Sequence, residues 1–300
     1  MLLKAEGLYV LITPARNEEA YIERTIQSVV CQTVLPQRWV IVSDGSTDRT
    51  DEIVNKYVAQ YNFMCLVRNE AERVQDFRSK AKAFNTGLAQ LRGVAYDFIG
   101  NLDADVALES HYYEHVLDKF QQNPQLGLAG GTLDDVYAGK PCKIIGSVSS
   151  VRGAIQLFRR QCFEAIGGYV ATVHGGEDTV AEVMVRMKGW EVKTFFEIAG
   201  LHLRPVGGTH GGKLSTARVR QGEMDYSLGY HPLFEVVKCL RRLGEPPFLV
   251  GSALRLCGYF RAGLRGDSHT VSHDFITYLR QEQLGRLRKR FPLLAARPRA

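Results

Sequence analysis

An apolar stretch that ends in two carboxylates constrains this chain more than any other feature. Residues Tyr96–Val106 read Tyr-Asp-Phe-Ile-Gly-Asn-Leu-Asp-Ala-Asp-Val, so Asp103 and Asp105 follow a short run of aromatic and branched side chains. Such a run is typical of a buried strand, and buried strands normally end in turns rather than in paired acids. We therefore place both carboxylates at the C-terminal edge of a strand, where open α/β sheets bind ligands.

Two explanations fit this Asp-x-Asp triplet. Carboxylates that converge at a sheet edge form a hard oxygen site suited to Mg²⁺ or Mn²⁺. Alternatively, Asp103 and Asp105 make a turn and cap a helix that begins near Ser110. The triplet is compatible with both, so the choice depends on the rest of the chain.

Four strand-and-helix pairs within about 100 residues predict a parallel sheet with right-handed crossovers, and thus an α/β fold. Besides the stretch before Asp103, the expected strands are Leu8–Thr13, which Pro14 should end, Trp39–Ser43 and Phe63–Val67. Ala15–Glu19 is predicted to open the first helix. In Asp44–Asp48, Gly45 permits a tight turn and Ser46, Thr47 and Asp48 suit helix N-caps, which leaves the Asp44 carboxylate free for a ligand.

Further acidic residues follow between residues 126 and 205. Leu126–Leu133 is an expected strand, and Asp134 and Asp135 after it are a rival metal-binding pair. We favour a turn for them, because adjacent side chains of an extended segment point to opposite faces. Glu177 and Asp178 open a predicted helix, where N-capping alone would explain them. A strand over residues 190–204 contains His202.

Composition limits the class of protein. At 300 residues, with 45% hydrophobic and 23% charged residues, the chain is globular. Six scattered cysteines without a C-x-x-C pair suit buried free thiols in a reducing compartment, and the first seven residues do not resemble a signal peptide, so we expect a cytoplasmic protein.

Positive charge is concentrated at the C-terminus. The last 20 residues carry six Arg and Lys against one Glu, so this tail suits an anionic membrane surface, nucleic acid or plain solvation. We place a domain boundary near Lys213, after the glycine-dense segment Gly207–Gly212, which is either a mobile lid or a connector. Residues 247–264 are too short and too interrupted by Arg255 and Arg261 to span a bilayer. They suit either an anionic membrane surface, together with the basic tail, or packing against the main domain.

Two nucleotide-binding fingerprints are missing from the sequence. Neither G-x-G-x-x-G nor G-x-x-x-x-G-K-[ST] follows the first strand. Acids, a metal ion and basic side chains would therefore have to hold any nucleotide.

Six short motifs in this order resemble the family 2 glycosyltransferases, which are inverting enzymes of the GT-A fold that bind nucleotide sugars. The resemblance covers residues 8–205 and rests on Thr13-Pro-Ala-Arg-Asn-Glu18, Asp44-Gly-Ser-Thr-Asp48, Ser79-Lys80 through Leu88, Asp103-Ala-Asp105, Ile166-Gly-Gly-Tyr169 and Gly176-Glu-Asp178. It implies a GT-A, Rossmann-like, mostly parallel sheet with flanking helices over residues 1–212 and a basic helical extension over residues 213–300.

The resemblance also implies roles for particular residues. The nucleotide would be held by Asp44, which accepts from a pyrimidine N–H, and by Pro14, Ala15, Arg16, Glu18, Ser46, Lys80 and Asp103. Asp105 would ligate Mg²⁺ or Mn²⁺ that bridges the diphosphate, with Asp103 and His202 as further metal ligands. Asp178 would be the general base and Glu177 its supporting neighbour.

The activity that these roles imply is transfer of a hexosyl or N-acetylhexosaminyl group. The donor would be a nucleotide sugar, with a UDP-sugar first, and the acceptor a hydroxyl of a glycan or lipid-linked molecule in polysaccharide biosynthesis. No Gln-x-x-Arg-Trp motif follows, although Arg218-Val-Arg-Gln-Gly222 occupies similar territory, so we expect a single transfer rather than polymerisation. We expect no nucleic-acid partner, and a peripheral position at the inner face of the cell membrane if the basic part binds lipid. The alternative is a noncatalytic sugar-nucleotide or glycan-binding protein on the same scaffold.

Overall fold

The computed structural model describes residues 7–69, 78–137, 140–142, 146–205, 214–244 and 248–291. The chain divides into two compact units, which are treated separately below. The first, the sheet unit, comprises Met1–Ala171 and Glu177–Val206. The second, the helical unit, comprises Thr172–Gly176 and Gly207–Ala300.

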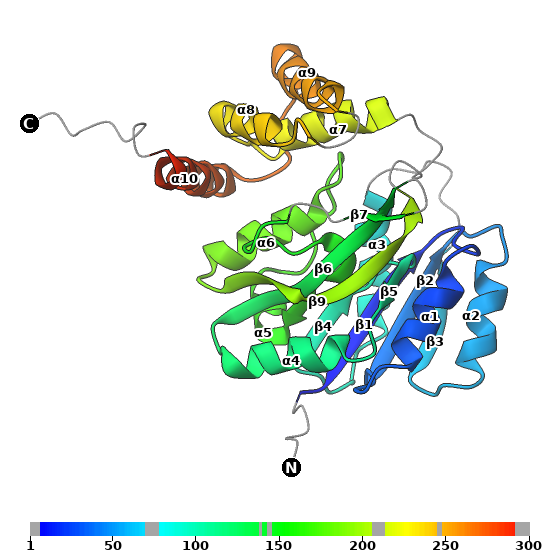
Figure 1. Cartoon of the computed structure of the whole chain (residues 1–300). Helices are drawn as coiled ribbons and strands as arrows, with labels where there is room; N and C mark the ends of the chain where they lie inside the picture. Colours follow the sequence, from blue (N-terminus) through cyan, green and yellow to red (C-terminus); the bar gives the residue numbers. More distant parts are fainter. Residues whose placement is uncertain are drawn as a thin grey trace, which may run out of the picture. The chain divides into compact units, whose positions relative to one another are not determined.

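The sheet unit is built on one mixed sheet (Figure 1). Its strand order is β3-β2-β1-β4-β8-β6-β9-β5, with β7 paired to β6. The strands are β1 (Tyr9–Ala15), β2 (Arg38–Asp44), β3 (Met64–Asn69), β4 (Phe98–Asn101), β5 (Val106–Leu108), β6 (Leu126–Tyr137), β7 (Lys140–Cys142), β8 (Leu157–Arg159) and β9 (Glu191–Pro205). The helices are α1 (Ile22–Val30), α2 (Thr50–Val58), α3 (Arg78–Ala89), α4 (Tyr112–Gln122), α5 (Arg160–Ala165) and α6 (Glu177–Met187).

The first four strands are parallel, as the strand-and-helix alternation predicts. β8 then runs antiparallel to both of its neighbours, β4 and β6, while β6 and β9 are again parallel. The predicted α/β class with a mostly parallel sheet and flanking helices is therefore confirmed. The acids after β4 lie at the carboxyl end of that strand.

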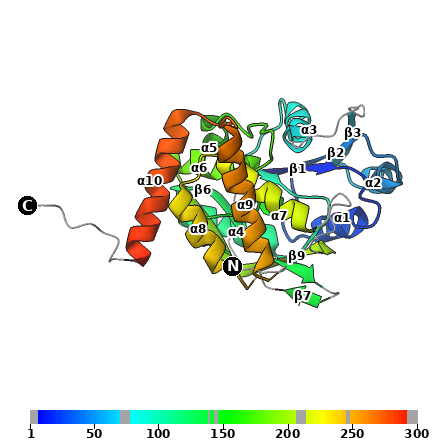
Figure 2. The same cartoon turned by 90° about the horizontal axis from the view of Figure 1, so that it is seen from above.

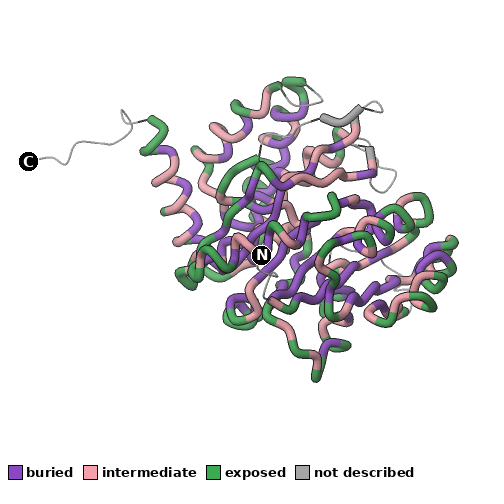
Figure 3. The backbone as a smooth tube through the Cα atoms, turned by 60° about the horizontal axis from the view of Figure 1, so that its bottom comes forward, coloured by how far each residue is buried: buried purple, intermediate pink, exposed green. Residues whose placement is uncertain are grey.

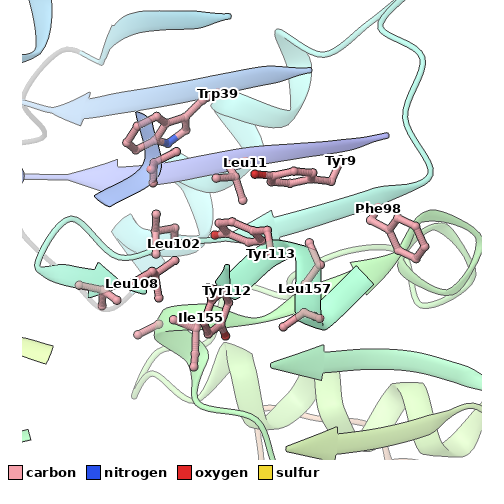
Figure 4. Close-up of a cluster of buried hydrophobic side chains, with 14 of the residues drawn as sticks. Tyr9, Leu11, Trp39, Phe98, Leu102, Leu108, Tyr112, Tyr113, Ile155 and Leu157 are labelled. Atoms are coloured by element: carbon pink, nitrogen blue, oxygen red, sulfur yellow. The ribbon is translucent and has the colours of Figure 1, made fainter. Parts of the chain in front are cut away.

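Successive side chains along the central strands point to opposite faces of the sheet and contribute to two hydrophobic cores, one on each face. Tyr9 and Leu11 of β1 pack on the side of α1, α2 and α4, whereas Val10 and Ile12 pack on the side of α3, α5 and α6. Figure 4 shows part of the first core, in which Tyr9 stacks on Tyr113 with ring centroids 4.6 Å apart. Because both faces are covered, the central strands are buried along most of their length (Figure 3).

Two local expectations about the first strand and helix are wrong. β1 continues through Pro14 to Ala15, and Pro14 pairs with Val42 of β2. The pairing with β4 ends at Ile12, so the proline, which has no N–H, lies where β1 has a partner on one side only. The segment after it is a loop, and α1 begins only at Ile22.

The cysteines are less uniformly buried than expected. All five cysteines whose side chains are described are free thiols, but only Cys162 and Cys239 are buried. Cys31 and Cys257 are exposed because each occupies a solvent-facing position at the end or on the outer side of a helix.

The helical unit contains α7 (Leu214–Ser227), α8 (Pro232–Arg241), α9 (Val250–Arg265) and α10 (His273–Arg290). In this unit α8 packs between α9 and α10, and α7 packs against α9 (Figure 2). Within the described ranges, no helix combines the length and apolar character that crossing a membrane requires. The segment Gly207–Gly212 and the tail residues Arg297 and Arg299 lie outside the described residues.

Glycines let α7 and α9 approach closely, and this yields a stability prediction. A Cβ at Gly222 would lie 1.9 Å from the Arg255 carbonyl oxygen, which belongs to rigid helix backbone. We expect Gly222→Ala to lower the free energy of unfolding by about 1–3 kcal/mol, measured by urea denaturation followed by circular dichroism. Gly285→Ala is the matched control. It meets no atom within 4 Å and should gain up to about 1 kcal/mol of helix propensity. Equal effects of the two substitutions would contradict the close packing.

Candidate active site

The loops after β1 and β2 are joined at the carboxyl edge of the sheet. The Thr47 N–H donates to Asn17 Oδ1 at 2.8 Å, and the Asn17 N–H donates to Ser46 Oγ at 3.2 Å. Asn17 has a φ of 54°, a left-handed conformation that asparagine tolerates well. These contacts bring the predicted cofactor-binding residues of the two loops together, namely Pro14, Ala15, Arg16, Glu18, Asp44 and Ser46.

Asp48 rather than Asp44 stabilises the start of α2. The Thr50 N–H donates to Asp48 Oδ1 at 3.0 Å, and the Glu19 N–H donates to Asp48 Oδ2 at 3.0 Å. The Asp44 carboxylate has a looser contact, with its Oδ2 3.9 Å from Arg16 Nη1. Asp44 therefore takes no part in capping, and Arg16 and Asp44 can both turn to a ligand.

Lys80 of α3 forms an ion pair with both carboxylate oxygens of Asp103. Its Nζ lies 2.8 Å from Oδ1 and 2.9 Å from Oδ2 of that carboxylate. The Asn101 side-chain amide donates to Asp103 Oδ1 at 2.9 Å and to the Gly153 carbonyl oxygen at 2.6 Å. Burial alone would lower the pKa of Lys80, but the charges of Asp103 and Glu177 raise it above its usual value. Lys80 is thus a permanent cation beside the Asp-x-Asp segment.

A small pocket lies next to this pair. It is lined by Lys80, Ala81, Phe84, Asn101, Gly153, Tyr169, Glu177 and Asp178, so the two acids at the start of α6 face the predicted basic residue of α3. Asp105 is not one of its lining residues. Burial raises the pKa of the Glu177 carboxyl group, and the neighbouring Asp178 adds to this effect while Lys80 opposes it.

The position of Asp178 depends on Gly153. A Cβ at residue 153 would lie 2.5 Å from Asp178 Oδ2, so only glycine leaves room for this carboxylate. The Thr179 N–H donates to Asp178 Oδ1 at 2.7 Å. Behind it, the buried Gln156 accepts from the Tyr169 hydroxyl at 2.6 Å. Tyr169, the last residue of the Ile166–Tyr169 motif, therefore lines the pocket and is held in place by Gln156.

Glu182 lies one helical turn after Asp178 and is buried. Its Oε1 accepts from the Val151 N–H at 2.6 Å and from the Ser150 hydroxyl at 3.2 Å. Burial raises the pKa of Glu182 to about 8, which Arg186 opposes and the charge of Asp178 reinforces. At neutral pH Glu182 is therefore protonated, and it places no second negative charge beneath Asp178.

This burial predicts a pH-dependent stability. In the unfolded chain Glu182 ionises near pH 4.5, but in the native state it ionises near pH 8. The stability that this group contributes is complete below pH 4.5 and is lost as the pH rises towards 8. We expect the free energy of unfolding to fall by a few kcal/mol across this window, and Glu182→Gln to remove this part of the slope. Parallel urea titrations of both proteins from pH 5 to 9 measure it, and identical slopes would contradict the assignment.

Asp105 belongs to a second cluster of charged side chains, distinct from the pair of Lys80 and Asp103. Its Oδ2 accepts from Arg204 Nε at 2.8 Å, and its Oδ1 lies 3.3 Å from His202 Nε2. Burial alone would raise the pKa of Asp105, but His202 and Arg204 lower it to about 2. Arg204 also bonds both carboxylate oxygens of Glu18, whose pKa burial raises to about 7 although Arg204 opposes this.

Asp135 completes this cluster, which corrects its interpretation as a turn residue. β6 extends to Tyr137, so Asp135 lies inside a strand, where it is paired in register with His202 of β9. Its Oδ1 lies 3.2 Å from His202 Nδ1 and 2.8 Å from Arg152 Nη1. Burial would lower the pKa of His202, but Asp105 and Asp135 raise it to about 9.

Arg204, Arg152 and Asp135 are site residues that sequence reasoning missed. Arg204 follows His202 by two residues on the same strand, so the period of two could have indicated that both face the same side. The contact of Asp135 depends on the register between β6 and β9, for which no local pattern exists.

The donor chemistry at Asp105 fits a divalent cation. Oδ1 of Asp105 and Nε2 of His202 face each other at 3.3 Å, and adjacent ligands on an octahedral ion with bonds of about 2.1 Å lie about 3 Å apart. The second imidazole nitrogen meets a carboxylate, as in many metal-binding histidines. Within the part of the chain that the structure describes, no three or more His, Cys, Asp or Glu side chains are grouped to hold a metal. The protein would thus supply two ligands of such an ion.

Together, the fold and site define a protein that presents acids and cations at the carboxyl edge of a mostly parallel α/β sheet. Residues 10–161 match the model of glycosyl transferase family 2. This chain belongs to that family, as the resemblance implies.

Curated relatives and solved structures agree with this assignment. The chain is 25% identical over 255 residues to poly-β-1,6-N-acetyl-D-glucosamine synthase of Staphylococcus aureus (strain COL). The match covers 79% of this chain and 58% of that synthase, so the chain spans less than two thirds of its relative. The fold is similar to that of the mannosyltransferase PcManGT from Pyrobaculum calidifontis in complex with GDP-Man and Mn²⁺, with a TM-score of 0.56, 18% identity and coverage of 95% of this chain and 81% of that one. It is also similar to S. aureus TarS residues 1–349 in complex with UDP-GlcNAc, with a TM-score of 0.55, 13% identity and coverage of 93% and 80%.

Proposed function

We propose that this protein is a metal-dependent, inverting glycosyltransferase that moves one sugar from a nucleotide sugar, with a UDP-sugar first, to a hydroxyl group of a glycan or lipid-linked acceptor. Residues 1–212 would carry the reaction and residues 213–300 would be an accessory extension. The observation that supports this best is that each carboxylate of the Asp-x-Asp segment belongs to a different acid site. Asp105 lies with Arg204 and His202. Asp103 pairs with Lys80, which lines the pocket together with Asp178.

The donor would bind along the first loops of the sheet. Arg16 and Asp44 lie at the joined loops after β1 and β2, where Asp44 can accept from a base N–H and Arg16 can reach phosphate. Asp105 and His202 would hold a divalent cation, and Asp103 would contact the ribose or metal-bound water. That cation would neutralise charge on the departing diphosphate.

Two chain cations would assist departure. Lys80 lies against Asp103, and Arg204 lies against Asp105, so each can stabilise negative charge next to the Asp-x-Asp segment. Both already have carboxylate partners, which fixes their geometry before substrate arrives. Burial holds the pKa of Glu18 at about 7, so this carboxyl group can change protonation at neutral pH when a ligand draws the Arg204 guanidinium group away from it.

Asp178 would accept the proton of the attacking hydroxyl group. It lies at the first turn of α6, Gly153 leaves space in front of its Oδ2, and the neighbouring Glu182 is uncharged at neutral pH. A base on one side of the sugar and a leaving group on the other is the arrangement that inversion needs. Glu177, on the same pocket wall, would orient the acceptor.

Donor-dependent thermal stabilisation and turnover test this function. UDP-sugars and GDP-mannose are added with and without Mn²⁺, and nucleoside diphosphate release is followed with hydroxyl-bearing acceptors. We expect one nucleotide class to raise Tm only with Mn²⁺, by an amount that corresponds to about 2.7 kcal/mol at 100 times Kd. Stabilisation without any release or transfer would favour the noncatalytic binding protein instead. Absence of stabilisation by every donor would contradict both.

A further inference from the structure

One face of α9 presents apolar side chains to solvent. The exposed fractions are 56% for Val250, 47% for Phe260 and 90% for Leu264. Ala253 and Cys257 are also exposed and continue the same helical stripe, because residues spaced by three and four lie on one face. Phe248 and Leu249, each 63% exposed, lie just before the helix. We call these seven residues the α9 stripe.

The opposite face of α9 packs against the other helices of its own unit. Gly251, Ser252, Arg255, Gly258, Tyr259 and Ala262 are its buried residues. The Arg255 guanidinium group bonds Asp225 and Glu235, and Gly258 allows backbone contact with Val219 of α7. The α9 stripe is therefore not a second packing face of the four-helix unit. It is an apolar surface that remains exposed to solvent.

The helical unit that carries the stripe is positively charged. Residues 207–300 carry 16 Lys and Arg against seven Asp and Glu, a formal charge of +9, whereas the whole chain has only +6. α9 itself contains three Arg and no Asp or Glu. Asp225 and Glu235 are buried in ion pairs with Lys238 and Arg255, and Arg261 and Arg265 pair with Glu223, so the excess positive charge lies on the other Lys and Arg of the unit. The last turn of α10 adds Arg288, Lys289 and Arg290, followed by the 43% exposed Phe291.

We propose that the α9 stripe docks on an anionic lipid bilayer, with α9 lying in the plane of the interface. An amphipathic helix without acids, in a unit with an excess of cations, combines the apolar and electrostatic attractions that interfacial binding requires. At about 1.5 Å per residue the 16 residues of α9 extend about 24 Å, enough for the stripe to bury several side chains among lipid headgroups. The cytoplasmic leaflet, which carries anionic lipid, is the membrane surface that this charge favours. This inference does not depend on the proposed glycosyl transfer.

Vesicle cosedimentation of the full chain tests the docking. Sucrose-loaded vesicles of phosphatidylcholine with 30% phosphatidylglycerol, a mixture of roughly the anionic content used for such tests, are compared with pure phosphatidylcholine at low and high salt. We expect binding to the anionic vesicles that weakens with salt. Phe260→Ser with Leu264→Ser should reduce the partition coefficient roughly tenfold or more, because two inserted side chains are lost.

The matched control is Phe196→Ser with Val148→Ser in the sheet unit. These side chains are 47% and 55% exposed, so apolar exposure is removed at a comparable level, and their partition coefficient should not change. Phe260→Trp adds a readout that does not need the double variant to fold, since its emission should shift to the blue only with anionic vesicles. No binding to anionic vesicles, equal loss in the control pair or an unshifted tryptophan would overturn the proposal. So would light scattering that shows a dimer which Phe260→Ser with Leu264→Ser dissociates without any effect on lipid binding.

Discussion

Asp178→Asn should reduce turnover by about 10²–10⁴-fold while nucleotide binding stays intact. The substitution keeps the shape of the side chain beside Gly153 and the acceptor atom for the Thr179 N–H, but removes the basic oxygen. The measurements are kcat for sugar transfer and the donor-induced rise in Tm with Mn²⁺. The first should collapse and the second should remain.

Glu177→Gln is the control for this prediction. It removes a carboxylate from the same pocket wall and the same helical turn, yet it leaves the proposed base in place. We expect a smaller loss than for Asp178→Asn. If Asp178→Asn retained full turnover, or if Glu177→Gln alone abolished it, the proton acceptor would have to be reassigned to Glu177 or to another group.

Asp105→Ala should abolish the Mn²⁺-dependent part of nucleotide binding and, with it, transfer. This carboxylate is the shared partner of Arg204 and His202, so its loss removes one of the two acid partners of each of these partly buried cations. The stabilisation by nucleotide should become the same with and without Mn²⁺, as measured by thermal shift. Because a partly buried cation that loses an acid partner is less well compensated, Tm of the free protein should fall as well.

Asp134→Ala is the matched control for Asp105→Ala. Asp134 belongs to the same strand as Asp135, but adjacent residues of a strand face opposite sides, so its carboxylate points away from His202. We expect Mn²⁺-dependent binding to be unchanged in this variant. An equal loss in both variants would show that removal of any nearby negative charge is enough, and that Asp105 has no ligand role.

Much of the site followed from local sequence. Asp103 and Asp105 were expected at the end of a buried strand, and Glu177 and Asp178 at the start of a helix, and the structure places them there. Capping of α2 by Asp48 was among the predicted possibilities. These features depend on the alternation of apolar residues and on side chains that bond their own backbone within a few residues, so a short window of sequence contains the information.

Other parts of the site depend on contacts between distant segments. Asp134 and Asp135 were assigned to a turn because adjacent side chains of an extended segment point to opposite faces, yet long pairing with β9 extends β6 past both residues, and Asp135 alone faces His202. The bond between Glu18 and Arg204 joins residues 186 positions apart. The continuation of β1 through Pro14 depends on which neighbour is present at that position of the sheet.

The sequence by itself determined the α/β class, the acids at the sheet edge, the charged C-terminal part and the family, because each is recorded in residue type and short spacing. Only the tertiary structure decided that Arg204, His202 and Asp135 surround Asp105, that Lys80 pairs with Asp103, and that one face of α9 stays in water. The physical reason is register and burial. Which carboxylate meets which cation, and which apolar side chain finds no partner, depends on how strands and helices far apart in the chain align.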